Sequence, residues 1–160
     1  MTSIAAQNIG AGRWDRVSRI TWTGIAFNIT LTGTLVLFLH WFNREALGLF
    51  LPEGGKAIDL GMHINDVTLW SFIIFGTFTV MAGVVRASGA VVGPLIVSFI
   101  ALLFVRNPLA VFFGHHYGFN AIWWSFPSGF AVATTLNFLN YRFGNWRKTR
   151  LIAQAPNRAT

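Results

Sequence analysis

The sequence predicts an all-α integral membrane protein with four transmembrane helices. Of its 160 residues, 54% are hydrophobic and only 11% are charged, whereas charged residues make up roughly a quarter of a typical soluble domain. Several apolar runs are long enough, at about 1.5 Å per residue, to cross a hydrocarbon core about 30 Å thick. Two of these runs are joined by a short hinge, so they are expected to be antiparallel neighbours. In water such a hairpin would expose an unusually large apolar surface.

The net charge of +7 does not indicate a nucleic-acid partner. Most of the basic residues flank apolar runs, where the topology of a membrane protein places them. The lipid bilayer is therefore the partner that this charge pattern predicts. The chain has no cysteine, which excludes disulfides, thiolate metal sites and a thiol nucleophile.

Residues 1–19 are predicted to be a cytoplasmic leader or a segment between helices, and the first span covers 20–42. This span is uncharged and reads ITWTGIAFNITLTGTLVLFLHWF. Its polar and small residues form two stripes on roughly opposite faces: Thr21, Gly24, Asn28 and Thr32 on one, and Thr23, Thr30 and Thr34 on the other. Such stripes favour protein neighbours on two sides. Asn28 either bonds across to a neighbouring helix or faces a polar transport pathway, and the residues leave both open.

A polar connection containing Pro52 leads into the second span, which is predicted over 57–85. Helical spacing starts near Ala57 and continues directly into the apolar run. Gly76 and Gly83 lie on one face and predict a groove for close helix contact.

Arg86 ends the second span, and the hinge ASGAVVGP follows with Gly89 in it. Pro94 opens the third span, predicted over 93–113, because proline in a first helical turn removes only an amide that has no partner. Arg106 and Pro108 interrupt this span near its far end, where Pro108 frees the carbonyl of Phe104. Arg106 either snorkels to the lipid headgroups or faces a water-filled cavity.

Residues 114–118 are predicted to form a turn and 119–141 the fourth span, so that the transmembrane region covers 20–145. Ser125 and Ser128 share one face and are candidates for the transport pathway, while Pro127 is expected to kink the helix. Residues 146–160 are predicted to be a basic cytoplasmic tail, with Trp146 at the level of the headgroups.

Charge sets the predicted topology. With four spans both termini share one side of the membrane, and that side collects Arg13, Arg16, Arg19, Arg86 and the basic tail. By the positive-inside rule this side is cytoplasmic. We therefore expect a multi-pass protein of the cell inner (plasma) membrane with both termini in the cytoplasm.

No pattern in the chain supports catalysis. The segment Pro127-Ser128-Gly129 is similar to a phosphatase signature, but Phe130 stands where a histidine would be needed. His115 and His116 are expected in an exposed loop, and the acids nearby lack the spacing of metal ligands. Neither an enzyme activity, a cofactor nor a metal site is expected.

Four motifs nevertheless resemble a known family when taken in order. They are QNIGAGRWDRVSR at 7–19, GVVRASGAVVGPL at 83–95, VRNPLAVFF at 105–113 and YRFGNWRK at 141–148. The chain resembles the last third of a multidrug and toxic compound extrusion (MATE) transporter, that is, its final four helices. The resemblance implies two six-helix lobes around a central cavity and cation-coupled export of organic cations or other toxic compounds.

The chain differs from members of this family in two respects. Family members have about twelve helices, so the chain is expected to be a fragment that needs the missing helices, or self-association, for transport. Some members carry a cation-binding acid midway along their tenth helix, whereas residues 71–76 here read SFIIFG. The coupling ion, proton or sodium, is therefore unknown. An alternative of another class is a small oligomeric four-helix membrane protein with a structural or assembly role.

Overall fold

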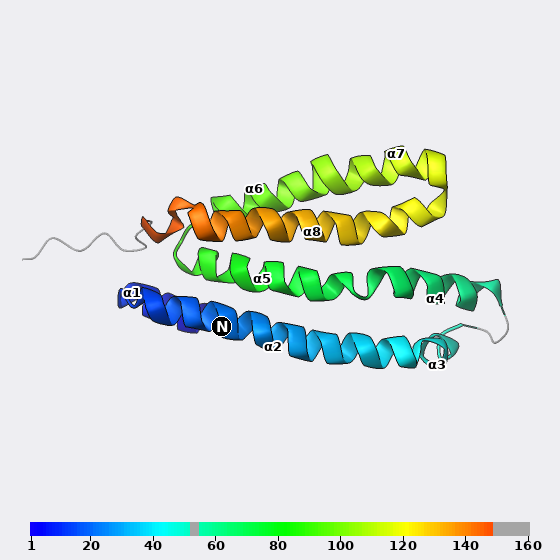
Figure 1. Cartoon of the computed structure of the whole chain (residues 1–160), viewed down its shortest axis with the longest axis horizontal. Helices are drawn as coiled ribbons and strands as arrows, with labels where there is room; N and C mark the ends of the chain where they lie inside the picture. The colour runs from blue at the N-terminus through cyan, green and yellow to red at the C-terminus, as the bar shows by residue number, and fades with distance from the viewer. Residues whose placement is uncertain (52–54, 149–160) are drawn as a thin grey trace, which may run out of the picture.

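The computed structural model describes residues 1–51 and 55–148, and in that part of the chain every regular element is helical. The all-α prediction is therefore confirmed at the level of fold class. The long helices lie side by side in a row, with α2 at one edge, α4 and α5 next, then α8, and α6 and α7 at the other edge (Figure 1). Their bounds are α2 Trp14–Trp41, α4 Lys56–Thr68, α5 Ser71–Ala87, α6 Val92–Ile100, α7 Asn107–Tyr117 and α8 Phe119–Phe143.

The segment predicted as a leader, 1–19, is itself largely helical. Helix α1 covers Thr2–Gly10, and α2 already begins at Trp14. The chain reverses between them at Gly12, whose φ of 68° is a left-handed conformation that glycine adopts without strain. Ala5 of α1 is fully buried against Val17 and other apolar side chains of the bundle. This burial explains why the segment is ordered.

Helix α2 runs without interruption for 28 residues and packs through one of its two stripes. Thr21 and Gly24 are buried there, whereas Thr23 and Thr30 on the other stripe are exposed. Within the described chain, only one face of α2 therefore has a helical neighbour along the bundle, in place of the two that the pattern predicts. A short helix, α3 (Asn43–Gly48), follows.

The second predicted span, 57–85, is broken instead of straight. Helices α4 and α5 meet at an angle of 42°. At the break the hydroxyl of Ser71 donates to the carbonyl of Thr68 at 2.5 Å, and the hydroxyl of Thr68 donates to the carbonyl of Ile64 at 2.8 Å. Hydroxyls that compete for backbone carbonyls in this way are a known cause of helix bending. Pro52 lies outside the described residues.

The third predicted span, 93–113, contains a π-helix. Helix α6 passes into η1 (Ala101–Arg106), and the amide of Asn107 then bonds five residues back to the carbonyl of Leu102. The wider turn lies directly before Pro108, which has no amide with which to continue the regular ladder. Residues 114–117, predicted as a turn, continue α7, so His115 lies on a helix and not in a loop. The chain turns at Gly118.

Two helices of the described chain are long and apolar enough to span a membrane, namely Trp14–Trp41 and Val92–His115. The bent pair α4 and α5 makes a third if it counts as one span. The fourth predicted span corresponds to α8, which is 25 residues long but is not among these candidate spans. Several of its polar side chains, such as Thr134 and Asn137, bond to α5.

Different segments of the chain lie at the two ends of the row. The start of α2, the connection between α5 and α6 and the end of α8 lie together at one end, while α3 and the turn between α7 and α8 lie at the other (Figure 1). Trp146, predicted as a headgroup anchor, is instead 4% exposed and donates its indole N–H to the carbonyl of Tyr141 at 2.8 Å. The part of the predicted tail from 149 to 160 lies outside the described residues.

Candidate functional site

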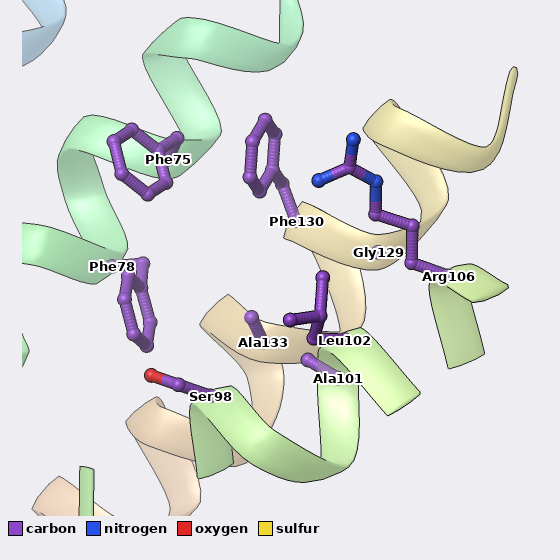
Figure 2. Close-up of a pocket in the computed structure, with 9 residues that line it drawn as sticks. All are labelled: Phe75, Phe78, Ser98, Ala101, Leu102, Arg106, Gly129, Phe130 and Ala133. Atoms are coloured by element: carbon purple, nitrogen blue, oxygen red, sulfur yellow. The ribbon is translucent and has the colours of Figure 1, made fainter. Parts of the chain in front are cut away.

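A cavity of about 190 Å³ lies where α5, α8 and the α6–η1 segment meet (Figure 2). Three phenylalanine side chains form much of its wall: Phe75 and Phe78 from α5, and Phe130 from α8. The ring centroids of Phe75 and Phe130 are 4.8 Å apart, and those of Phe75 and Phe78 are 6.2 Å apart. These residues offer aromatic faces and edges to whatever occupies the space.

Small residues provide the space itself. Ala101, Gly129 and Ala133 line the cavity where α6–η1 approaches α8, and none of them has a side chain larger than a methyl group. A Cβ atom on Gly129 would lie 3.1 Å from the Cβ of Arg106, which is closer than ordinary carbon contact. Glycine at 129 therefore allows the arginine to pass close to α8.

Arg106 also lines this largely apolar cavity, and its side-chain carbons lie beside Gly129. Its guanidinium carbon lies 3.7 Å from the centre of the Phe126 ring, an arrangement that attracts the cation to the ring face. The side chain is half-buried. None of the residues that line the cavity is acidic, and no acid pairs with Arg106 in the described part of the chain.

Asn28, the first predicted pathway residue, does not line this cavity. Its amide donates to the carbonyl of Ile73 on α5 at 3.2 Å and accepts from the hydroxyl of Thr32 at 3.2 Å. Gly76 leaves the room for this amide, because a Cβ at that position would collide with it. Asn28 thus makes the bond between helices that one of its two sequence interpretations expects, and its place in a transport pathway stays a prediction.

Ser125 and Ser128 also lie outside the cavity. The hydroxyl of Ser125 donates to the carbonyl of Ile122 at 2.6 Å, and that of Ser128 donates to the carbonyl of Trp124 at 2.9 Å. Both serines therefore satisfy their donors within α8, whose helix continues through Pro127. Of the four predicted pathway residues, the structure brings only Arg106 to the cavity.

The predicted hinge and packing residues occupy distinct places. Gly83 faces α1, with the Thr2 hydroxyl 3.4 Å from where a Cβ would lie. Arg86 is exposed near the end of α5, and Gly89 has a φ of 86° that favours glycine at the turn. Pro94 is the third residue of α6 and is buried, and Pro108 is the second residue of α7.

A separate polar cluster joins the C-terminal ends of α2 and α4 and the start of α3. Nδ1 of His40 lies 3.2 Å from Oδ1 of Asp66, and the Asn43 amide donates to the same carboxylate oxygen at 3.4 Å. Asn65 donates to the side-chain oxygen of Asn43 at 2.7 Å. In the described residues no group of three or more potential metal ligands comes together.

Sequence reasoning missed the aromatic wall and Ser98, which also lines the cavity. The available signal was the spacing of Phe75 and Phe78, which are three residues apart and so share one face of a helix. Aromatic residues are frequent throughout the chain, at 16%, and the spacing alone does not distinguish a cavity wall from a lipid-facing surface.

Comparison with known proteins places the chain in a family. No solved structure matches it. It is 33% identical over 153 residues to the Bacillus subtilis protein named "Probable multidrug resistance protein YoeA", covering 92% of this chain and 33% of the relative. It is 27% identical over 154 residues to "Probable multidrug resistance protein YpnP" of the same organism, covering 96% of this chain and 34% of the relative. The chain thus spans about a third of the length of these curated relatives.

The family model MatE matches residues 1–112, which include α1, α2, α5 and the arginine of the cavity. The resemblance inferred from the four sequence motifs is thereby confirmed. With a family match over most of its length and apolar helices long enough to span a bilayer, this membrane protein belongs to the MatE family.

Proposed function

We propose that this chain is the C-terminal third of a MATE-type exporter and contributes its final four helices to a cation-coupled antiporter. The transporter would use a proton or sodium gradient to export drug-like or toxic organic compounds, and its role is transport and not catalysis. The observation that carries the proposal is the family match over residues 1–112. The names of both relatives, which describe probable multidrug resistance proteins, support the same direction.

The chain alone would not be transport-competent. Alternating access requires two halves that rock about a site near the middle of the membrane, and one row of helices offers a single half at most. Phe75 and Leu102, which line the cavity, are 40% and 48% exposed. The cavity therefore lies at the surface of the row, where the missing helices, or a second copy of the chain, would complete it.

The proposed orientation places both termini in the cytoplasm of a cell with the protein in its inner (plasma) membrane. If α8 is the fourth crossing, the first and last described elements lie at one end of the row, as this orientation requires (Figure 1). Arg13, Arg86 and Arg147 belong to segments at that same end, which is the basic side that the positive-inside rule requires.

A chimera tests the proposal directly. The third of the YoeA relative that aligns with this chain is replaced by the complete chain, and the chimera is expressed in a bacterium that lacks its own drug exporters. We expect drug resistance and energy-dependent efflux of a fluorescent dye well above the level given by the relative with that third deleted. A chimera that reaches the membrane in normal amount but exports no more than the deletion would contradict the proposal.

A further inference from the structure

We propose that one end of the helix row binds the headgroups of anionic phospholipids in the membrane surface that it faces. This surface, the arginine end, consists of Arg13, Arg16, Arg19, Arg86, Arg142 and Arg147. It lies where the start of α2, the end of α5 and the end of α8 come together (Figure 1). The inference goes beyond transport, because it requires only that the helices cross a bilayer.

The charge of the arginine end favours an anionic partner. All of its arginines are exposed, and in the described residues of these segments Asp15 is the acid that accompanies them. None of the arginines forms an ion pair with an acid in the described part of the chain. At the opposite end exposed acids outnumber exposed bases, with Glu45, Asp59 and Asp66 against Arg44 and Lys56. The arginine end therefore carries positive charge that the protein itself does not neutralise, and such a surface attracts anions.

A buried apolar cluster holds the arginine end in shape. Four of the arginines are next in sequence to a member of this cluster. The pairs are Arg16 with Val17, Arg86 with Val85, Arg142 with Tyr141 and Arg147 with Trp146. Charged groups whose backbone is already fixed lose less conformational freedom when a ligand binds. Packing thus places arginines from three parts of the chain together before any lipid arrives.

The residue type of this surface suits a phosphate group. Lysine would satisfy the positive-inside rule equally well, yet every basic residue of the arginine end is arginine. The planar guanidinium can bond two phosphate oxygens at once, whereas a lysine ammonium acts as a point charge. Helix stability does not explain Arg16, the third residue of α2, because the helix dipole disfavours a cation near the N-terminus.

The surface next to the arginines favours a lipid over a soluble anion. Arg16, Arg19 and Trp22 follow one another at intervals of three residues, so they lie along one side of α2. The side chain of Trp22 is 55% exposed, and tryptophan is common where headgroups meet hydrocarbon. A phospholipid likewise carries its phosphate next to its acyl chains. A soluble phosphate would gain nothing from the indole ring.

Contact quenching tests the proposal at both ends of α2. The chain has no cysteine, so one introduced cysteine can carry a fluorophore. Trp22→Cys reports on the arginine end and Leu37→Cys on the opposite end, and the two native side chains are 55% and 54% exposed. Each labelled chain is reconstituted in phosphatidylcholine nanodiscs that contain brominated phosphatidylglycerol or brominated phosphatidylcholine, because bromine quenches a fluorophore only on contact.

We expect the anionic lipid to be preferred at position 22 alone. At low salt, phosphatidylglycerol should reach half-maximal quenching there at a mole fraction at least about fivefold lower than phosphatidylcholine, the attraction expected of about one arginine. At position 37 the two lipids should quench equally. Raising the salt from about 0.01 M to about 1 M should remove the preference, because the screening length falls from about 30 Å to about 3 Å.

Two double substitutions of equal charge assign the preference to the arginine end. Arg16→Gln with Arg19→Gln should lower the preference at position 22 by at least about threefold, since two attractive charges are lost. Arg44→Gln with Lys56→Gln removes the same charge from the opposite end and should leave the preference unchanged. Circular dichroism checks that the variants keep their helices, and the salt titration of the labelled parent tests the inference without changing any charge.

Several outcomes would overturn the inference. They are equal quenching by the two lipids at position 22 in low salt, an equal preference for phosphatidylglycerol at positions 22 and 37, or equal losses from the two double substitutions. Sodium phosphate tests a soluble source of the same chemical group. If it displaces phosphatidylglycerol more effectively than sodium chloride of equal ionic strength, the surface binds free phosphate, and the inference is wrong.

The chimera separates this inference from the proposed function. Dye export by the chimera, together with no preference for phosphatidylglycerol at position 22, would remove the lipid-binding surface and leave the transporter assignment standing. A preference that depends on Arg16 and Arg19, together with a chimera that exports nothing, would remove the transport role while the lipid-binding surface stands.

Discussion

The two sides of the helix row are held together by different means. Between α2, α5 and α8, polar side chains bond across to backbone carbonyls of α5: Asn28 to Ile73, Thr134 to Ile74 at 3.1 Å, and Asn137 to Phe78 at 3.1 Å. The arm formed by α6, η1 and α7 meets α8 through small and aromatic residues, and the hydroxyl of Ser98 on this arm returns to the carbonyl of Pro94 in its own helix at 2.9 Å.

This difference explains where the cavity lies. Bonds between helices fix the register and draw the backbones together, especially where a glycine such as Gly76 admits the bonding side chain. On the arm, the π-helix widens one turn and places Arg106 close to Gly129 of α8. Wide turns of this kind are frequent at functional sites. The bonded side therefore holds α5 and α8 in place, and the cavity lies where the arm meets them.

The largest loss of stability is expected at Gly76, where the Asn28 amide lies against α5. Gly76→Ala would place a methyl group on the Asn28 amide and break its bond to Ile73, so we expect a loss of stability of about 1–3 kcal/mol, typical of overpacking. Unfolding of the chain in detergent, followed by circular dichroism, measures this loss.

Gly33→Ala in α2 is the matched control for Gly76→Ala. The nearest atom to its new methyl group would be Cδ1 of Ile73 at 3.9 Å, an ordinary contact, and no loss of stability is expected. Equal losses for the two variants would show that the close contact at Gly76 does not stabilise the α2–α5 side.

A substitution at Pro108 tests what causes the π-helix in the arm formed by α6, η1 and α7. Pro108→Ala restores one backbone amide, which should let η1 return to a regular α-helix with one further hydrogen bond, worth about 1 kcal/mol. Hydrogen exchange of residues 101–108 measures this effect.

Pro94→Ala is the control for this prediction, since Pro94 lies in the first turn of α6, where no amide partner is required. Unchanged hydrogen exchange after Pro108→Ala would contradict the assignment of the π-helix to the missing amide.

The smallest effect compares two neighbouring threonines of α8. Thr134 bonds across to Ile74, whereas the exposed Thr135 bonds to the carbonyl of Ala131 in its own helix at 2.8 Å. Thr134→Ala should cost about 0.6 kcal/mol, the average for a side-chain bond between membrane helices, and Thr135→Ala should cost almost nothing. Unfolding in detergent measures both losses of stability. A larger loss for Thr135→Ala than for Thr134→Ala would contradict this prediction.

Much of the architecture could be predicted from single residues and their spacing. The apolar runs of α2 and of α6 through α7 indicate membrane helices because burying so much hydrocarbon in lipid is the simplest way to remove it from water. Gly89 indicates the hinge, and the stripe with Asn28 and Thr32 indicates the face that meets α5. These features depend on neighbours within a few residues of the chain.

The bends and the burial of the ends could not be predicted in this way. The break between α4 and α5 depends on which carbonyls the hydroxyls of Thr68 and Ser71 reach, and Trp146 is buried because α1 and Tyr141 supply its surroundings. At both places the chain has alternative local conformations of similar energy, and packing against other helices selects one of them.

The sequence by itself determined that the chain is a helical membrane protein, that its helices alternate in direction, and that Arg106 is an unusual charge in an apolar run. Only the tertiary structure decided that this arginine shares a cavity with phenylalanines from two other helices, while Ser125 and Ser128 do not reach it. Periodicity specifies the face of one helix, but a site requires the faces of three helices at a fixed distance, which their mutual packing sets.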